Sequence, residues 1–173
     1  MGDTYEKVQD SQTGLEKLLA KIPGWGGYQE RQNRRKADQL LRKTLADLLA
    51  AQIRNLDTAQ KDLIKHGKID LVDDVGSAVT QLQTFADRIR TATYGYSGMF
   101  DAVRINEDEL EQMYNFDASL FEYEERLKAA TARLREAISI GEGIMETITI
   151  IQDICREANS TFDQREHVMM GSQ

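Results

Sequence analysis

The sequence predicts an all-α protein, an elongated antiparallel up-down-up-down four-helix bundle preceded by a short N-terminal helix. Three observations carry this prediction. The 173 residues contain a single proline, a residue that interrupts helices and is frequent in most other fold classes. Apolar residues recur in alternating steps of three and four along four long segments, which is the spacing of one helical face. Short glycine-containing breaks separate these segments, as is typical of antiparallel neighbours in a bundle.

The N-terminal unit, residues 1–28, is predicted to contain a short amphipathic helix that ends at Pro23-Gly24. Its apolar face comprises Leu15, Leu18, Leu19 and Ile22. The next helix is expected from about Gln29 to His66, with Gly67 as its C-cap. Its apolar stripe comprises Leu41, Leu45, Leu48, Leu56 and Leu63, supported by Leu49 and Ile53.

Three further helices complete the predicted bundle, which spans residues 29–167. One is expected from about Asp70 to Tyr94, with Val72, Val75, Val79, Leu82, Ala86, Ile89 and Thr93 on its stripe. The next begins after Asn106 as N-cap and carries Met113, Phe116, Leu120, Tyr123, Leu127, Ala130, Leu134 and Ala137. The last, about 142–166, places Ile144, Ile148, Ile151, Cys155, Ala158 and Phe162 on one face, and residues 168–173 are expected to form a flexible tail.

Two glycine-aromatic segments interrupt this regular pattern. The first junction, residues 22–28, contains the only tryptophan, Trp25, together with Tyr28. The second junction, residues 94–101, reads Tyr94-Gly95-Tyr96-Ser97-Gly98-Met99-Phe100-Asp101. In the predicted topology, the helix that follows the first junction begins beside the second junction, so both fall at one end of the bundle. They are the most unusual part of the chain and the natural place for a function.

Charge is distributed unevenly over the same region. Residues 31–43 hold six basic side chains and one acidic side chain, for a net charge of +5. Residues 100–125 hold nine acidic side chains and one basic side chain, for a net charge of −8. Cations at a helix start oppose the helix dipole, so a compensating partner is expected. The favoured partner is the acidic start of the bundle helix that follows Asn106. The alternatives are an anionic partner or membrane surface, and a solvated face without a partner.

Neither junction fits a known catalytic or phosphate-binding motif. Gly24-Trp25-Gly26-Gly27 lacks a third glycine at Gln29 and a preceding strand, both of which a dinucleotide loop needs. Gly95-Tyr96-Ser97-Gly98 is followed by Met99 where a nucleophile elbow needs glycine. We therefore expect no enzyme, with the aromatic side chains either capping the bundle core or forming a patch for a partner.

Metal and redox chemistry have little support in the sequence. Two histidines, His66 and His167, lack the Glu-x-x-His spacing of dinuclear bundle sites, so no metal or cofactor is predicted. Inward carboxylates could still bind a hard cation, and the ones to check are Asp87, Asp101, Asp117 and Glu124. Cys155 is the only cysteine and lies on an apolar stripe, which predicts a buried, inert thiol.

The two junctions together resemble an uncharacterised group of bacterial helical proteins. That group pairs an Ile-Pro-Gly-aromatic-x-Gly-Tyr start and an Arg-rich helix with a Tyr-Gly-Tyr-x-Gly-aromatic-Phe-Asp turn. Here the start is Ile22-Pro23-Gly24-Trp25-Gly26-Gly27-Tyr28, and Met99 replaces the aromatic residue of the turn. The similarity covers roughly residues 15–125. It implies a bacterial origin and no activity.

The sequence thus predicts a non-enzymatic scaffold, adaptor or assembly subunit that binds a protein partner, or a second copy of itself, through the end with the two junctions. The residues expected to make the contact are Trp25, Tyr28, Arg31, Arg34, Arg35, Tyr94, Tyr96 and Phe100. The net charge of −7 argues against nucleic-acid binding. The single cysteine and the lack of a signal-like start favour the cytoplasm. Two alternatives are a peripheral protein on anionic membranes and a ligand- or metal-binding bundle.

Overall fold

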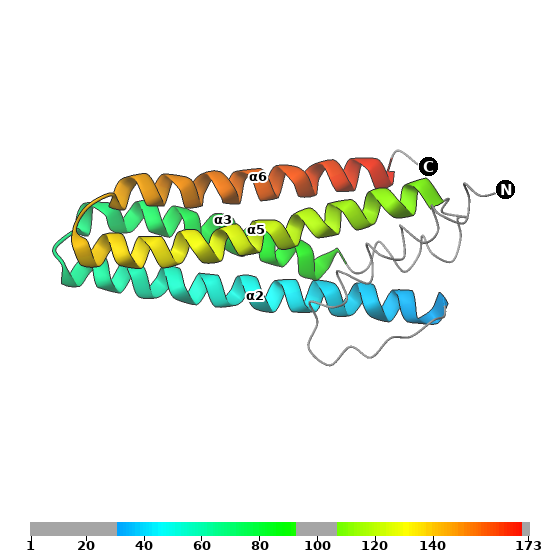
Figure 1. The fold of residues 1–173 in the computed structure, drawn as a ribbon, viewed down its shortest axis with the longest axis horizontal. Coiled ribbons are helices and arrows are strands. Elements are labelled where there is room, and N and C mark those ends of the chain that lie inside the picture. Colours follow the sequence, from blue (N-terminus) through cyan, green and yellow to red (C-terminus); the bar gives the residue numbers. More distant parts are fainter. Residues whose placement is uncertain (1–30, 93–106, 171–173) are drawn as a thin grey trace.

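The computed structural model describes residues 31–92 and 107–170, with side chains over 40–92 and 116–164. Four long helices form this part of the chain: α2 (Arg31–Lys65), α3 (Val72–Thr91), α5 (Glu107–Ile140) and α6 (Ile144–Met170). A short 3-10 helix, η1 (Ile69–Leu71), precedes α3. The helices lie side by side along one long axis (Figure 1), so the predicted all-α bundle is confirmed. The helix predicted within residues 1–28 lies outside the described residues.

The helix boundaries follow the glycine and capping signals of the sequence. Both α2 and α5 begin and end within two or three residues of the expected positions, and α5 begins at Glu107, directly after the expected N-cap position. The last helix extends further than expected, because α6 continues to Met170 and includes residues 168–170 that the sequence assigned to the tail. With 35 residues, α2 is about 52 Å long at 1.5 Å per residue.

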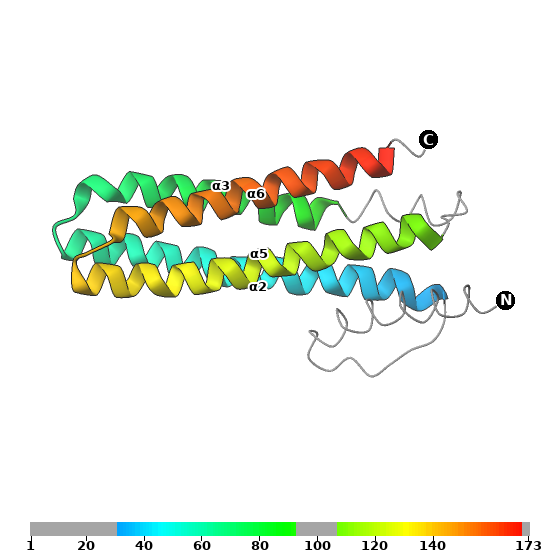
Figure 2. The same cartoon turned by 45° about the horizontal axis from the view of Figure 1, so that its top comes forward.

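Each helix is antiparallel to its successor in the hairpins α2–α3 and α5–α6. The first hairpin is held near its turn by the Gln60 side-chain amide, which donates to the Val72 carbonyl at 3.0 Å. The second has a hydrogen bond between Tyr123 and Thr161 (2.9 Å). Figures 1 and 2 show that α2 and α5 begin at one end of the bundle, where α3 and α6 end. The up-down-up-down order predicted from the sequence is therefore present.

The two hairpins pack side by side with parallel neighbours. Contacts join α2 to α5 and α3 to α6, whereas α2 and α6, like α3 and α5, lie across the bundle from each other. As a result, the chain between Thr91 and Glu107 links two helices on a diagonal of the bundle. With helices spaced 8–10 Å apart, that diagonal is about 14 Å. The fifteen residues 92–106 can span it easily, since an extended residue covers about 3.5 Å.

Glycines end α2 and α5 in left-handed conformations that other residues adopt only at a cost. Gly67 has φ 71°, its N–H bonds the Ile64 carbonyl at 3.1 Å, and the N–H of Lys68 bonds the Leu63 carbonyl at 2.9 Å. This pair of bonds is a Schellman motif, as the predicted C-cap required. At the other turn, Gly141 has φ 87° and its N–H bonds the Ala137 carbonyl at 2.8 Å.

The core is one continuous cluster of buried, mainly apolar side chains to which all four helices contribute. The predicted stripes supply most of it, and the α6 stripe from Ile144 to Phe162 is buried throughout. One predicted core residue is misplaced: the side chain of Leu48 is 37% exposed, whereas its neighbour Leu49 is fully buried. The structure adds Phe85, whose ring meets that of Phe162 edge to face at 6.4 Å. Each helix touches two neighbours, so its buried face is wider than a single stripe.

Cys155 is buried in this core, as predicted, and faces α3. Burial raises the pKa of its thiol from 9.0 to about 12. Because the thiolate is the reactive form, the folded protein should not react with Ellman's reagent at pH 8. Reaction should begin only when urea unfolds the chain. Fast labelling of the folded protein would contradict the buried position.

The same pKa shift predicts a loss of stability at high pH. Between pH 9 and 12 the unfolded chain loses the Cys155 proton while the folded chain keeps it, so the free energy of unfolding falls as the pH rises. The slope from this group should be about 1.4 kcal/mol per pH unit at most. Urea titrations of wild type and Cys155→Ala over this range measure it, since the alanine variant keeps every other titrating group. Equal slopes in the two proteins would refute the assignment.

Candidate functional site

The bundle has two ends of different character. At the junction end, α2 and α5 begin while α3 and α6 finish. Residues 1–30 and 93–106, which contain both glycine-aromatic junctions, are therefore bonded to helices at this end. At the turn end lie the connection from α2 to α3 and the connection from α5 to α6 (Figure 1). His66 lies at the turn end, as the sequence predicted.

Most of the predicted contact residues fall outside the described part of the chain. This applies to Trp25, Tyr28, Tyr94, Tyr96 and Phe100, whose mutual arrangement therefore stays a prediction. The basic residues Arg31, Arg34 and Arg35 lie in the first turns of α2, where only the backbone is described.

The structure does place the basic and acidic segments next to each other. Residues 31–43 form the start of α2, residues 107–125 belong to the first half of α5, and these two helices are parallel neighbours. Arg42 and Asp117 are both buried and line the same pocket between the helices. This arrangement supports neutralisation within one molecule, the favoured explanation of the uneven charge.

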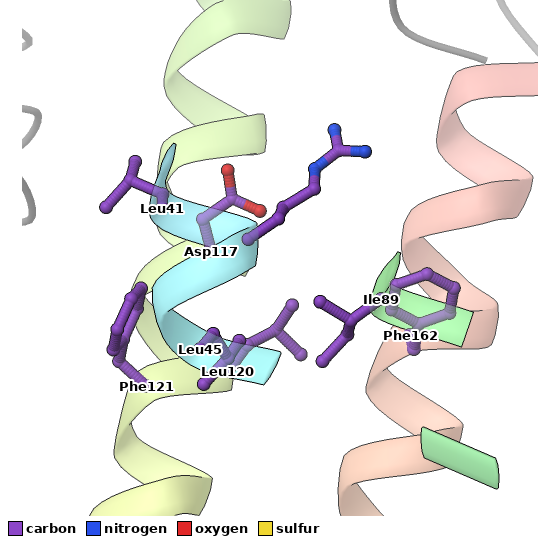
Figure 3. Close-up of a pocket in the computed structure, with 8 residues that line it drawn as sticks. Leu41, Leu45, Ile89, Asp117, Leu120, Phe121 and Phe162 are labelled. Atoms are coloured by element: carbon purple, nitrogen blue, oxygen red, sulfur yellow. The ribbon is translucent and has the colours of Figure 1, made fainter. Parts of the chain in front are cut away.

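The pocket that contains these two residues is small and otherwise apolar. Figure 3 shows Leu41, Asp117 and Phe121 on one side and Ile89 and Phe162 on the other. Its volume of about 10 Å³ is at the lower limit for a single water molecule. A metabolite does not fit into a space of this size, so the pocket is a packing feature of the core.

A second buried polar group lies further along the same pair of helices. The Gln52 amide donates to Glu124 at 3.2 Å, and the Asn55 amide donates to the Gln52 carbonyl oxygen at 3.2 Å. Asp117, Glu124 and Thr131 are buried at seven-residue intervals on α5. Asp117 and Glu124 were expected to point inward, but the contact of Glu124 with Gln52 on α2 was not predicted. The heptad spacing of the three polar residues was the available signal.

The carboxylates considered as cation ligands do not meet. Asp87 is exposed on α3 and pairs with Arg90 at 3.6 Å, whereas Asp117 and Glu124 lie on α5 across the bundle. Asp101 is outside the described residues. Over residues 40–92 and 116–164, no group of three histidine, cysteine, aspartate or glutamate side chains is close enough to hold a metal ion.

The turn end carries the most exposed large apolar side chains of the described residues. Ile64, Ile69, Ile140 and Met145 are each more than half exposed and flank the two turns. Within the helices that the structure describes, none is both long enough and apolar enough to cross a membrane. Because of these exposed apolar side chains, the turn end is a second surface at which partner binding can be tested.

The Gln52–Glu124 contact should contribute measurably to stability. Glu124→Ala leaves a buried Gln52 donor without its acceptor and creates a cavity, so the free energy of unfolding should fall by about 2–4 kcal/mol. Glu124→Gln keeps a carbonyl acceptor and should lose less than half as much. Urea titration measures both, with Glu122→Ala on the exposed face as control, expected within about 0.5 kcal/mol of wild type. If Glu124→Ala matched this control, the buried bond would be energetically neutral.

Comparison with known protein families, sequences and structures finds no relative of the chain. No protein-family model, no curated protein sequence and no solved structure matches the chain.

Proposed function

We propose that the protein is a non-enzymatic helical scaffold or adaptor that binds a protein partner through its junction end. The observation that carries this proposal is the convergence of helix ends there. The starts of α2 and α5 and the ends of α3 and α6 lie together, and both glycine-aromatic junctions are bonded to them. Aromatic and arginine side chains are the types that contribute most to protein interfaces.

The interior of the bundle supports a role that depends on its surface. The described core consists mainly of apolar side chains with a few buried polar ones, and the pocket near the junction end has room for about one water molecule. Burial raises the pKa of the Cys155 thiol from 9.0 to about 12, so the less reactive protonated form persists even at alkaline pH. A packed, elongated bundle suits a protein that holds partners at fixed positions.

Charge defines how a partner would approach. The basic start of α2 lies beside the acidic start of α5, so residues of both charges occur at the junction end. In this proposal Trp25, Tyr28, Tyr94, Tyr96 and Phe100 anchor the partner, while Arg31, Arg34 and Arg35 steer it. Adjacent opposite charges favour a protein surface with its own mixed charge over a uniformly anionic membrane.

The proposal is tested by capture from a lysate of the source organism, followed by quantitative mass spectrometry. Wild type should enrich a specific partner, and Trp25→Ala/Tyr96→Ala should lose at least 10-fold of that enrichment, since each truncated anchor removes a hot-spot contact worth about 1–2 kcal/mol. Circular dichroism should show unchanged helix content in the double variant.

The turn end provides a matched control. Ile64→Ser/Ile140→Ser removes two exposed apolar side chains at the opposite end and should leave the capture unchanged. Loss of the partner in this variant, with retention in Trp25→Ala/Tyr96→Ala, would move the binding surface to the turn end. Arg31→Gln/Arg34→Gln/Arg35→Gln should reduce the association rate most strongly at low salt.

A further inference from the structure

The axial alignment of the two hairpins is not set by the chain connection between them. Within each hairpin, a short turn fixes how the two helices pair: six residues separate α2 from α3, and three separate α5 from α6. Between the hairpins, fifteen residues connect α3 to α5, enough chain to allow many alignments. Side-chain contacts must therefore select the observed one.

Apolar packing alone discriminates poorly between alignments seven residues apart. The buried side chains of α3 and α6 repeat in steps of three and four, so a slide of one heptad brings apolar groups opposite apolar groups again. Such a slide moves one hairpin by about 10 Å along the other, at 1.5 Å per residue. A buried polar side chain that has a hydrogen-bond partner in only one of the two alignments can distinguish them.

Two amide hydrogen bonds join α6 to α3. The Gln152 amide donates to the Asp74 carbonyl at 3.0 Å, and the Asn159 amide donates to the Gln81 carbonyl at 3.4 Å. Both acceptors are backbone carbonyls, which recur at every turn of α3, and the two donors are seven residues apart. After a slide of one heptad, Asn159 would lie opposite the Asp74 carbonyl in place of Gln152, so these bonds fit the observed alignment but do not select it. Contacts between side chains are needed for that selection.

Asn159 is itself held in place from both helices. Its amide also donates to the Cys155 carbonyl at 2.9 Å, and Arg88 of α3 donates to its side-chain oxygen at 3.3 Å. The same guanidinium lies over the Phe162 ring, 4.8 Å from its centre, and pairs with Asp163. These contacts fix the level of α3 relative to α6 at the end nearer the junctions.

The other seam between the hairpins carries one further bond of this kind. Gln52 of α2 donates to Glu124 of α5 at 3.2 Å, with both side chains buried. A slide of one heptad would place Glu124 opposite Leu45 or Ala59, both apolar, and leave a buried carboxylate without its donor. Each buried polar group stranded in this way costs about 1–3 kcal/mol.

We infer that two side-chain contacts, Gln52–Glu124 and Arg88–Asn159, here called the interhairpin rungs, select the axial alignment of the two hairpins. They determine the axial register of the bundle, as a buried polar residue determines the register of the helices in a coiled coil. The inference stands on these contacts and does not depend on the proposed partner. At the junction end, the start of α5 is therefore held at a fixed position along the bundle axis relative to the start of α2.

The test uses pulsed electron paramagnetic resonance between two spin labels. Thr80→Cys on α3 and Met145→Cys on α6 introduce exposed thiols, and the buried Cys155 stays unlabelled because its pKa is about 12. At the observed alignment the two sites differ by thirteen residues in level, which is roughly 20 Å along the axis. A slide of one heptad changes this axial offset by about 10 Å.

The rungs are removed by apolar replacements of similar length, Gln52→Met/Glu124→Met/Arg88→Met/Asn159→Leu. We expect wild type to give one distance and this variant to give a second distance displaced by several ångströms. A matched surface variant, Gln83→Met/Glu122→Met/Arg90→Met/Ser160→Leu, alters exposed positions on the same bundle and should keep the single distance.

One unchanged distance in the folded rung-free variant would overturn the inference, because apolar packing would then suffice to set the alignment. If circular dichroism shows that the four substitutions unfold the chain, Arg88→Met/Asn159→Leu is measured with the same labels. This pair should broaden the distance distribution or add a second distance, and a distribution of wild-type width would equally overturn the inference.

Discussion

The structure depends on the side-by-side packing of two helical hairpins whose neighbouring helices run parallel. This packing brings α2 against α5 and α3 against α6, so each seam between the hairpins joins helices that start at the same end. A long diagonal connection makes the arrangement possible, and the apolar column shared by all four helices stabilises it. The polar residues of the core lie mainly where one hairpin meets the other, which ties the alignment of the whole bundle to a few side chains.

Parallel neighbours also determine what each end of the molecule presents. With α5 as its parallel neighbour, the basic start of α2 has the acidic start of α5 beside it. Further along the same seam, Arg42 and Asp117 are both buried and line one pocket. Anions beside a cationic helix start offset its unfavourable interaction with the helix dipole. The opposite end, with its two glycine turns, carries exposed isoleucine and methionine side chains and mixed charge.

Much of the fold could be predicted from sequence because the local signals agree. Gly67 and Gly141 occupy left-handed positions that favour glycine, so the turns were found correctly. Burial was less predictable: Leu48 is rotated away from the core, and of the carboxylates expected to point inward, Asp117 and Glu124 are buried whereas Asp87 is exposed. Glu124 has a polar partner, Gln52, on α2, and only such a tertiary neighbour makes burial of a carboxylate favourable. The adjacent starts of α2 and α5 were expected, but no periodic pattern encodes the diagonal crossing from α3 to α5. The junction residues proposed for binding stay a sequence-based hypothesis.

The seven-residue spacing of Gln152 and Asn159, matched by Asp74 and Gln81, restricts how the length of this protein can change during evolution. One residue inserted between Gln152 and Asn159 would turn the rest of α6 by about 100°, moving its apolar face towards solvent and its amides away from α3. Only insertions or deletions of whole heptads, made at the same level in all four helices, keep every face and every polar pair in place. The distance between the two ends of the molecule is thus expected to vary among descendants in steps of about 10 Å.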